Sequence, residues 1–113
     1  MKILDKVVTI EELREIATNS FGDLVKVVVD VDRGLVAIDA ELHSDLEAIF
    51  LENGSQQKSL WGINFYPFLE SGDFIEFDSL INMRPSQGNM IRGVHDELTR
   101  QKIIEIANRW VKR

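Results

Sequence analysis

Hydrophobic residues recur at helical spacing in three parts of the chain. A capping box that begins at Thr9 precedes the first of them and predicts a helix over about 10–21. Ser44, with a glutamate three residues later, repeats this signal and predicts a short helix over about 45–53. A last helix is predicted from about Asp96, with an apolar stripe made of Leu98, Ile103, Ile104, Ala107, Trp110 and Val111.

Between the first two helices, apolar residues alternate with polar ones, which is the period of a half-buried strand. Valines alternate over 24–31, and a second alternating run covers 35–40. Asp32, Arg33 and Gly34 lie between the two runs and are typical of a turn. The pattern therefore predicts a β-hairpin.

The alternation returns after the second helix. Trp61, Ile63 and Phe65 share one phase of a strand that Pro67 ends, because proline cannot donate to a strand ladder. The run FIEFDSLINMR then predicts a partner strand, which places on one face Ile75, Phe77, Ile81 and Met83.

These elements predict one α+β domain over residues 1–113. The expected order is α-β-β-α-β-β-α, with two hairpins forming a mostly antiparallel, four-stranded sheet and three helices covering its apolar face. No pair of strands is expected to be joined by a single helical crossover.

Composition and charge narrow the classes of function. The net charge of -6 disfavours nucleic acid as a partner, because phosphate contacts require clustered cations. No apolar run approaches the ~20 residues of a membrane span, and no signal peptide is evident, so a cytoplasmic protein is expected. The absence of cysteine excludes disulfides and thiolate chemistry.

Polar residues gather on the second face of the predicted second hairpin. With Asn64 opposite Glu76, this face carries Asn64, Tyr66, Glu76, Asp78, Asn82 and Arg84. One interpretation is a solvated outer face, which is usual for an antiparallel sheet covered on one side. The other is a polar network, structural or ligand-binding, because Asp and Asn are poor strand formers.

The stretch RPSQGN follows this strand and is a candidate anion site. Arg84 and Arg92 offer fork donors for a carboxylate or phosphate, and Ser86, Gln87 and Asn89 lie in the loop between them. The alternative is a structural loop in which the arginines pair with acidic residues of the strand. There is no P-loop or GxGxxG motif.

The stretch ELHSD is the other candidate site. Glu41, His43 and Asp45 are residue types that ligate a divalent metal, and His43 also suits a general base. The alternative is local structure only, since no HExxH motif is present. Ser79 and Ser86 lie in no GxSxG elbow, which disfavours a serine hydrolase.

The motifs ELHSD, LENGSQQ, LWGIN, IEFDSLIN and RPSQGN together resemble an uncharacterised family of small prokaryotic proteins known only as a domain of unknown function. The resemblance runs from about Thr9 to the last helix and implies no activity. It implies that the family motif positions are His43, Trp61, Gly62, Asn64, Asp78, Ser79, Asn82, Arg84, Pro85, Ser86, Gln87, Gly88, Asn89 and Arg92.

Three functions are compatible with these observations. The first is a small binding or regulatory module, in which Arg84 and Arg92 hold a small anionic ligand or a partner carboxylate and Asn64, Asp78 and Asn82 fix the loop. The second is a metal-dependent hydrolase that uses ELHSD. The third is an interaction subunit whose sheet edge recruits a protein partner.

Overall fold

The computed structural model describes residues 1–113, with three helices packed on a twisted, mainly antiparallel sheet. The helices are α1 (Ile10–Thr18), α2 (His43–Glu52) and α3 (Glu97–Trp110). The strands are β1 (Lys2–Ile3), β2 (Val8–Thr9), β3 (Val25–Asp30), β4 (Leu35–Ile38), β5 (Leu60–Phe65), β6 (Ile75–Glu76) and β7 (Val111–Lys112). No helix combines the length and the apolar character needed to cross a membrane.

The main sheet has five strands in the order β1-β4-β3-β5-β6, so the prediction of four strands in two hairpins was wrong in number and order. The β3–β4 hairpin is confirmed. The N-terminal β1 adds an edge strand beside β4, and the chain ends meet in a separate parallel pair, β2 with β7.

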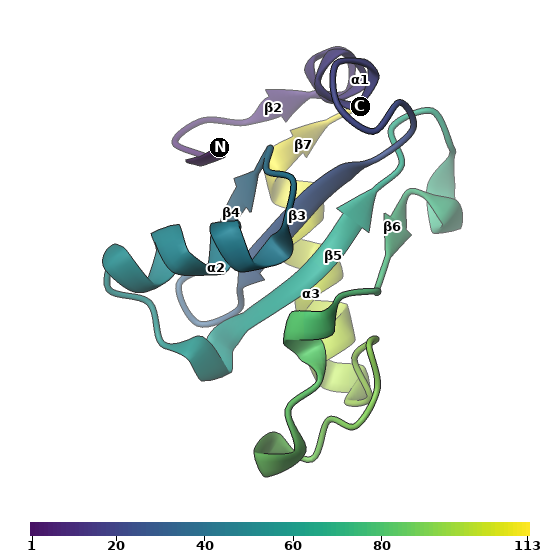
Figure 1. The fold of residues 1–113 in the computed structure, drawn as a ribbon. Coiled ribbons are helices and arrows are strands. Elements are labelled where there is room, and N and C mark those ends of the chain that lie inside the picture. Colours follow the sequence, from purple (N-terminus) through teal and green to yellow (C-terminus); the bar gives the residue numbers. More distant parts are fainter.

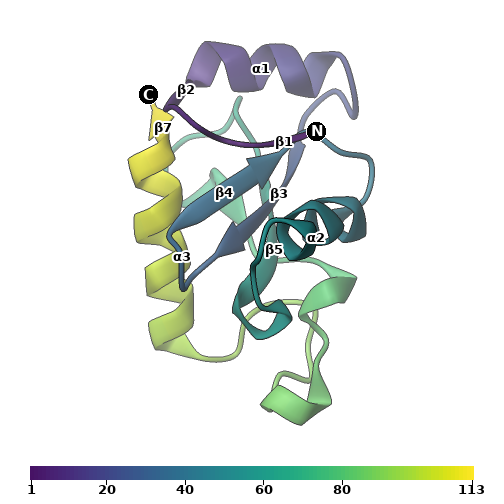
Figure 2. The same ribbon diagram turned by 90° about the vertical axis from the view of Figure 1, so that its left-hand side faces the viewer.

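The connection from β4 to β5 also differs from the prediction. Because β3 is antiparallel to both of its neighbours, β4 and β5 run parallel to each other with β3 between them. The helix α2 joins these two strands and crosses over β3, which is the helical crossover that the sequence was not expected to contain. Figures 1 and 2 show α2 on one side of the sheet and α3 on the other.

The sheet is therefore buried on both faces rather than on one. The larger core lies between the sheet and α1 and α3, and it includes Val27, Val29 and Ile63. The smaller core lies under α2, where Leu46 and Phe50 pack on residues of the opposite strand phase such as Val28. This second core explains why the first hairpin is apolar in both phases.

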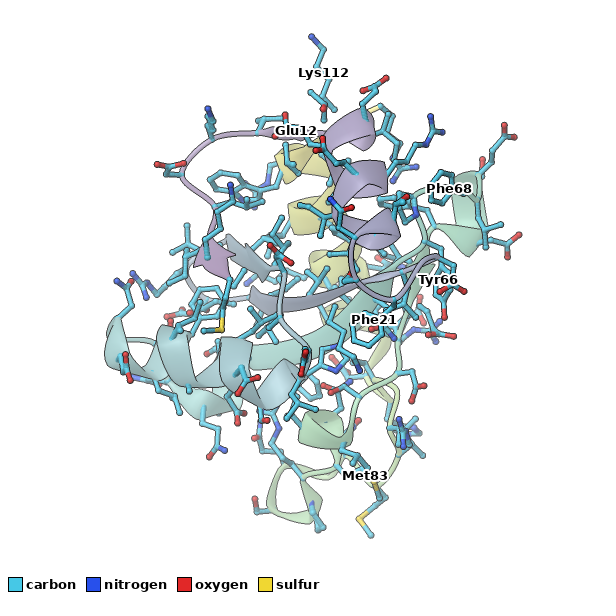
Figure 3. All side chains as sticks on the ribbon, turned by 45° about the horizontal axis from the view of Figure 1, so that its top comes forward. Glu12, Phe21, Tyr66, Phe68, Met83 and Lys112 are labelled. Atoms are coloured by element: carbon cyan, nitrogen blue, oxygen red, sulfur yellow. The ribbon has the colours of Figure 1, made fainter.

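The second hairpin forms only at its start. Asn64 pairs with Glu76, as predicted, but the ladder stops there and the chain turns into a short 3-10 helix at Leu80–Asn82. The predicted faces beyond Asp78 are consequently wrong. Met83 is 47% exposed and Figure 3 shows its side chain pointing away from the body of the protein, whereas Asn82 is fully buried.

The three helices each differ from the predictions at one point. The capping box at Thr9 is confirmed, although α1 ends three residues before the predicted position. Ser44 does not cap α2, because the helix already begins at His43 and its N-cap position, Leu42, has no side-chain oxygen to offer. In α3, Leu98 is exposed, and Ile106 is a core residue that the predicted stripe omitted.

Candidate functional site

A pocket of about 500 Å³ opens on the α2 side of the sheet, next to the N-terminus of α2. The sheet face beneath α2 consists of cross-strand rows, and the helix covers the rows that contain Val28 and Leu60. The next row, formed by Lys26, Asn64 and Glu76, lies beyond the first turn of the helix and forms the pocket floor. The pocket is thus the uncovered end of an otherwise buried face.

Two segments form the walls of the pocket. On one side are Leu42, His43 and Ser44 at the start of α2, and on the other is the segment from Asp78 to Ile81 with Arg92 beside it. Tyr66, labelled in Figure 3, lies at the β5 end of the floor. The volume is within the range of small-molecule sites.

Gly62 allows the two walls to approach each other. A Cβ atom at this position would lie 2.5 Å from Cβ of Ser79 and 3.2 Å from Cδ2 of His43. The backbone N–H of Ser79 donates to the carbonyl of Arg92, and its hydroxyl oxygen accepts from the N–H of Ile81, so Ser79 is fixed in place. The His43 atom nearest to a Cβ at Gly62 is Cδ2, and no hydrogen bond joins Ser79 to His43, so the geometry does not favour a Ser–His catalytic pair.

His43 is buried, and one of its ring nitrogens has a fixed role. Nε2 lies 2.8 Å from the carbonyl oxygen of Ile63, and because a carbonyl can only accept, Nε2 carries the proton. Burial lowers the pKa of His43 below its ordinary value of 6.5, and the charge of Lys26 lowers it further, against the opposing hydrogen bond to Ile63. At neutral pH the ring is therefore neutral, with a lone pair on Nδ1.

The lowered pKa of His43 predicts a loss of stability in acid. The unfolded chain binds a proton at His43 more readily than the folded protein does. The free energy of unfolding therefore falls as the pH drops below 6.5, and it continues to fall until the pH has passed the lower folded-state pKa. Urea unfolding at a series of pH values measures this slope. His43→Gln should remove the contribution of His43 to this pH dependence and leave the contribution of the carboxylates. If the free energy of unfolding had the same pH dependence in both proteins, the prediction would be wrong.

Asn64 is the most unusual residue of the floor. Its Nδ2 donates to Oε1 of Glu76 at 2.9 Å and to the carbonyl of Asp78 at 3.3 Å. Its Oδ1 is buried and is the one buried side-chain polar atom that has no hydrogen-bond partner. Leaving such an atom unpaired costs about 1–3 kcal/mol. A buried acceptor without a partner is rare in native proteins, so Oδ1 of Asn64 is a candidate contact point of the pocket.

The rim of the pocket is positively charged on two sides. Arg92 donates from Nε to Oδ1 of Asp78 at 2.6 Å, and its side chain remains 54% exposed. Lys26 lies near His43 at the β3 end of the floor, next to the rim, with its ammonium 5.4 Å from the centre of the Phe21 ring. No side chain caps the N-terminus of α2, where Ser44 faces the pocket. Uncapped N–H groups and nearby cations favour an anion.

Three predicted ligand residues, Asn64, Asp78 and Arg92, are brought together in this pocket. Arg84 is not among them. Its guanidinium donates to the carbonyls of Gln57, Ile81 and Leu60 and stacks 4.4 Å above the ring of Trp61. These contacts leave Arg84 little capacity for a ligand.

The other residues of the RPSQGN stretch also lie outside the pocket. Gln87 accepts from Arg84 and donates to the carbonyl of Lys58, which ties the tip of the loop to the segment before β5. Ser86 is exposed. The loop therefore matches the structural alternative considered from the sequence. Arg92 pairs with Asp78 as that alternative expected, whereas Arg84 pairs with backbone carbonyls instead of an acidic residue.

Asn82 and Asn89 have structural roles as well. The amide of Asn82 pairs with both the N–H and the carbonyl of Gly62, at 2.8 and 2.9 Å, and also donates to the carbonyl of Arg92. It therefore replaces the strand ladder where β6 has ended. The amide of Asn89 donates to three carbonyls and accepts from the N–H of His95.

The predicted metal ligands are not brought together. Glu41 and Asp45 are exposed, whereas His43 is buried with Nε2 bound to Ile63. No group of three His, Asp or Glu side chains has a geometry suited to a metal ion. Lys26 and Ser44 line the pocket but were not predicted from the sequence. The strand register would have revealed Lys26, because it lies directly opposite Asn64.

Comparison with known proteins gives a family but no activity. The family described as "Protein of unknown function (DUF5674)" matches residues 2–110. The chain belongs to this family. The match confirms the expected membership of a family of unknown function, and it extends further toward the N-terminus than the resemblance did. No curated protein and no solved structure matches the DUF5674 chain.

Proposed function

We propose that this DUF5674 protein is a binding module for a small anionic molecule, which occupies the pocket at the N-terminus of α2. The observation that carries the proposal is the buried, unpartnered Oδ1 of Asn64 in a pocket of about 500 Å³. Natural proteins rarely leave such an atom unpaired. The proposed site is not at the tip of the RPSQGN loop. The loop instead supports the wall of the pocket.

The rim supports an anion as the charged part of the ligand. Lys26 and Arg92 supply two cations, and the first turn of α2 supplies uncapped backbone N–H groups. Asp78 engages only Nε of Arg92, which leaves the terminal nitrogens of the fork for a carboxylate or phosphate. Leu42 and Leu80, both largely exposed, border the same pocket and suit the apolar part of a ligand.

Replacement of Arg92 tests the proposal. We expect inorganic phosphate and small dicarboxylates to shift the backbone amide signals of residues 42–45 and 78–80 in two-dimensional NMR titrations. Arg92→Ala should weaken this binding about tenfold, because a charged hydrogen bond is worth about 1.5–3 kcal/mol. Arg100→Ala is the matched control, since Arg100 is also exposed and pairs with one carboxylate, Glu97.

The control should bind as the unmodified protein does. If no anion moves the signals around the pocket, or if Arg92→Ala and Arg100→Ala bind equally well, the pocket is not an anion site.

A further inference from the structure

Asn64 and His43 present two unfilled acceptors in the same pocket. The orientation of the Asn64 amide is fixed by its neighbours, because Nδ2 faces the carboxylate of Glu76 and the carbonyl of Asp78. Exchanging nitrogen and oxygen would place Oδ1 against two other oxygens. Oδ1 must therefore be the atom without a partner, and Asn64 is only 5% exposed.

The second acceptor is Nδ1 of His43. Because Nε2–H donates to the carbonyl of Ile63, the neutral ring has its lone pair on Nδ1, to which no protein group donates a hydrogen bond. The Asn64 side chain lies within hydrogen-bond reach of the imidazole and would raise the pKa of His43 by favouring the charged ring, but burial lowers the pKa more, so the ring stays neutral. The one N–H of a neutral His43 is used by the carbonyl of Ile63, so His43 cannot donate to Oδ1 of Asn64. The N–H groups of Asn64 are used by Glu76 and Asp78, so Asn64 cannot donate to Nδ1 of His43.

The ligand group that fills both positions must donate twice. A carboxylate, a fully ionised phosphate or a carbonyl donates no hydrogen, and a hydroxyl or a singly protonated phosphate donates one. An amino group, neutral or charged, donates at least two. We infer that the pocket floor recognises a primary amino group, which donates one N–H to Oδ1 of Asn64 and another to Nδ1 of His43.

This inference rests on the proposed function and makes it more specific: the ligand is an anionic metabolite that also carries an amine. The anion lies at the rim with Lys26 and Arg92, and the amine lies at the floor. Two carboxylates, Glu76 and Asp78, offset the two cations, so a positively charged amine is not repelled from the floor while the anion binds to Lys26 and Arg92. Both a charged alkylammonium and a neutral aromatic amine fit this chemistry.

Two matched pairs of compounds separate the amine from the anion. Adenosine 5′-monophosphate and inosine 5′-monophosphate share a phosphate and a ribose but differ in the exocyclic amine. Glutamate and glutarate share two carboxylates but differ in the ammonium group. NMR titration of the DUF5674 protein with each compound, followed at the Asn64 side-chain amide and the His43 ring nitrogens, gives four dissociation constants.

We expect the amine-bearing member of at least one pair to bind about tenfold more tightly, as for one or two net hydrogen bonds. A preference within the nucleotide pair identifies an aromatic amine, and one within the dicarboxylate pair identifies an ammonium. Ratios near one in both pairs, with binding retained, overturn the amine inference and leave the anion proposal intact. If none of the four compounds, nor phosphate, moves the pocket signals, both fail.

Two further measurements test the roles of His43. His43→Phe should abolish the preference for the amine while anion binding remains. If that variant does not fold, acid provides the same test in the unmodified protein, because protonated Nδ1 is no longer an acceptor. The preference for the amine should then disappear as His43 becomes charged. The other charged groups around His43 are Lys26, Glu76, Asp78 and Arg92. A ring protonated on Nδ1 at neutral pH, detected by its nitrogen shifts, would contradict the inference.

Discussion

Gly62→Ala should destabilise the protein by about 3 kcal/mol, the upper part of the range for overpacking a fixed interior. The added methyl group would lie 2.5 Å from Cβ and 2.6 Å from Oγ of Ser79, well inside contact distance. Neither neighbour can move aside cheaply. Ser79 is held by the carbonyl of Arg92, and His43 is held by the carbonyl of Ile63. Urea unfolding measures the loss.

Gly72→Ala is the matched control for this substitution. No atom lies within 4 Å of a Cβ at Gly72, and its φ is not in the left-handed region. The change in the free energy of unfolding should therefore stay within about 0.5 kcal/mol, as at most surface positions. If Gly62→Ala were as mild as the control, the two walls of the pocket would be looser than the structure shows, and the pocket floor would not be preorganised.

The local parts of the fold could be predicted from the sequence. The β3–β4 hairpin and the capped start of α1 depend on residues close together in the chain, and both were predicted correctly. The pairs β1–β4 and β2–β7 could not be predicted, because β1, β2 and β7 are each two residues long and have no periodicity of their own. The crossover of α2 was also missed. The evidence for the crossover was the apolar character of both phases of β4, together with Val28 in the second phase of β3, which requires cover on two faces.

The candidate site was predicted in part. Asn64 and Asp78 were placed correctly next to Glu76, because the register of the second hairpin holds at that point. The error lay in extending the strand to Arg84. The alternation of apolar and polar residues continued in the sequence, whereas the chain had already left the sheet. Residues expected to face a ligand, such as Asn82 and Arg84, instead bind backbone carbonyls and N–H groups.

The departure of this segment from the sheet explains why its polar residues are buried. A chain that turns away from a ladder leaves backbone N–H and carbonyl groups unpaired, and these must be satisfied in another way. In this protein the side chains of asparagine and arginine take over that role, and they hold Asp78, Ser79 and Arg92 at the pocket. The RPSQGN stretch thus contributes to the site by supporting it.

Asn82→Ala should show the strength of this support most directly, with an expected loss of about 3–5 kcal/mol. The substitution leaves the N–H and the carbonyl of Gly62 without their partner in the centre of the protein, and each unpaired group costs about 1–3 kcal/mol. It also removes one of the two donors to the carbonyl of Arg92 and leaves only the N–H of Ser79, so the pocket signals of residues 78–80 should change in NMR spectra. Urea unfolding gives the free energy.

Two companion variants separate hydrogen bonding from the simple loss of a side chain. Asn108→Ala removes an exposed amide whose one partner is Arg113 on the surface, so it should change stability by no more than about 0.5 kcal/mol. Asn82→Asp keeps the acceptor for Gly62 N–H but turns a second oxygen toward two carbonyls, and it should lose at least as much stability as Asn82→Ala at neutral pH. A loss below about 1 kcal/mol in both Asn82 variants would mean that water can replace the amide, and that the wall of the pocket does not depend on it.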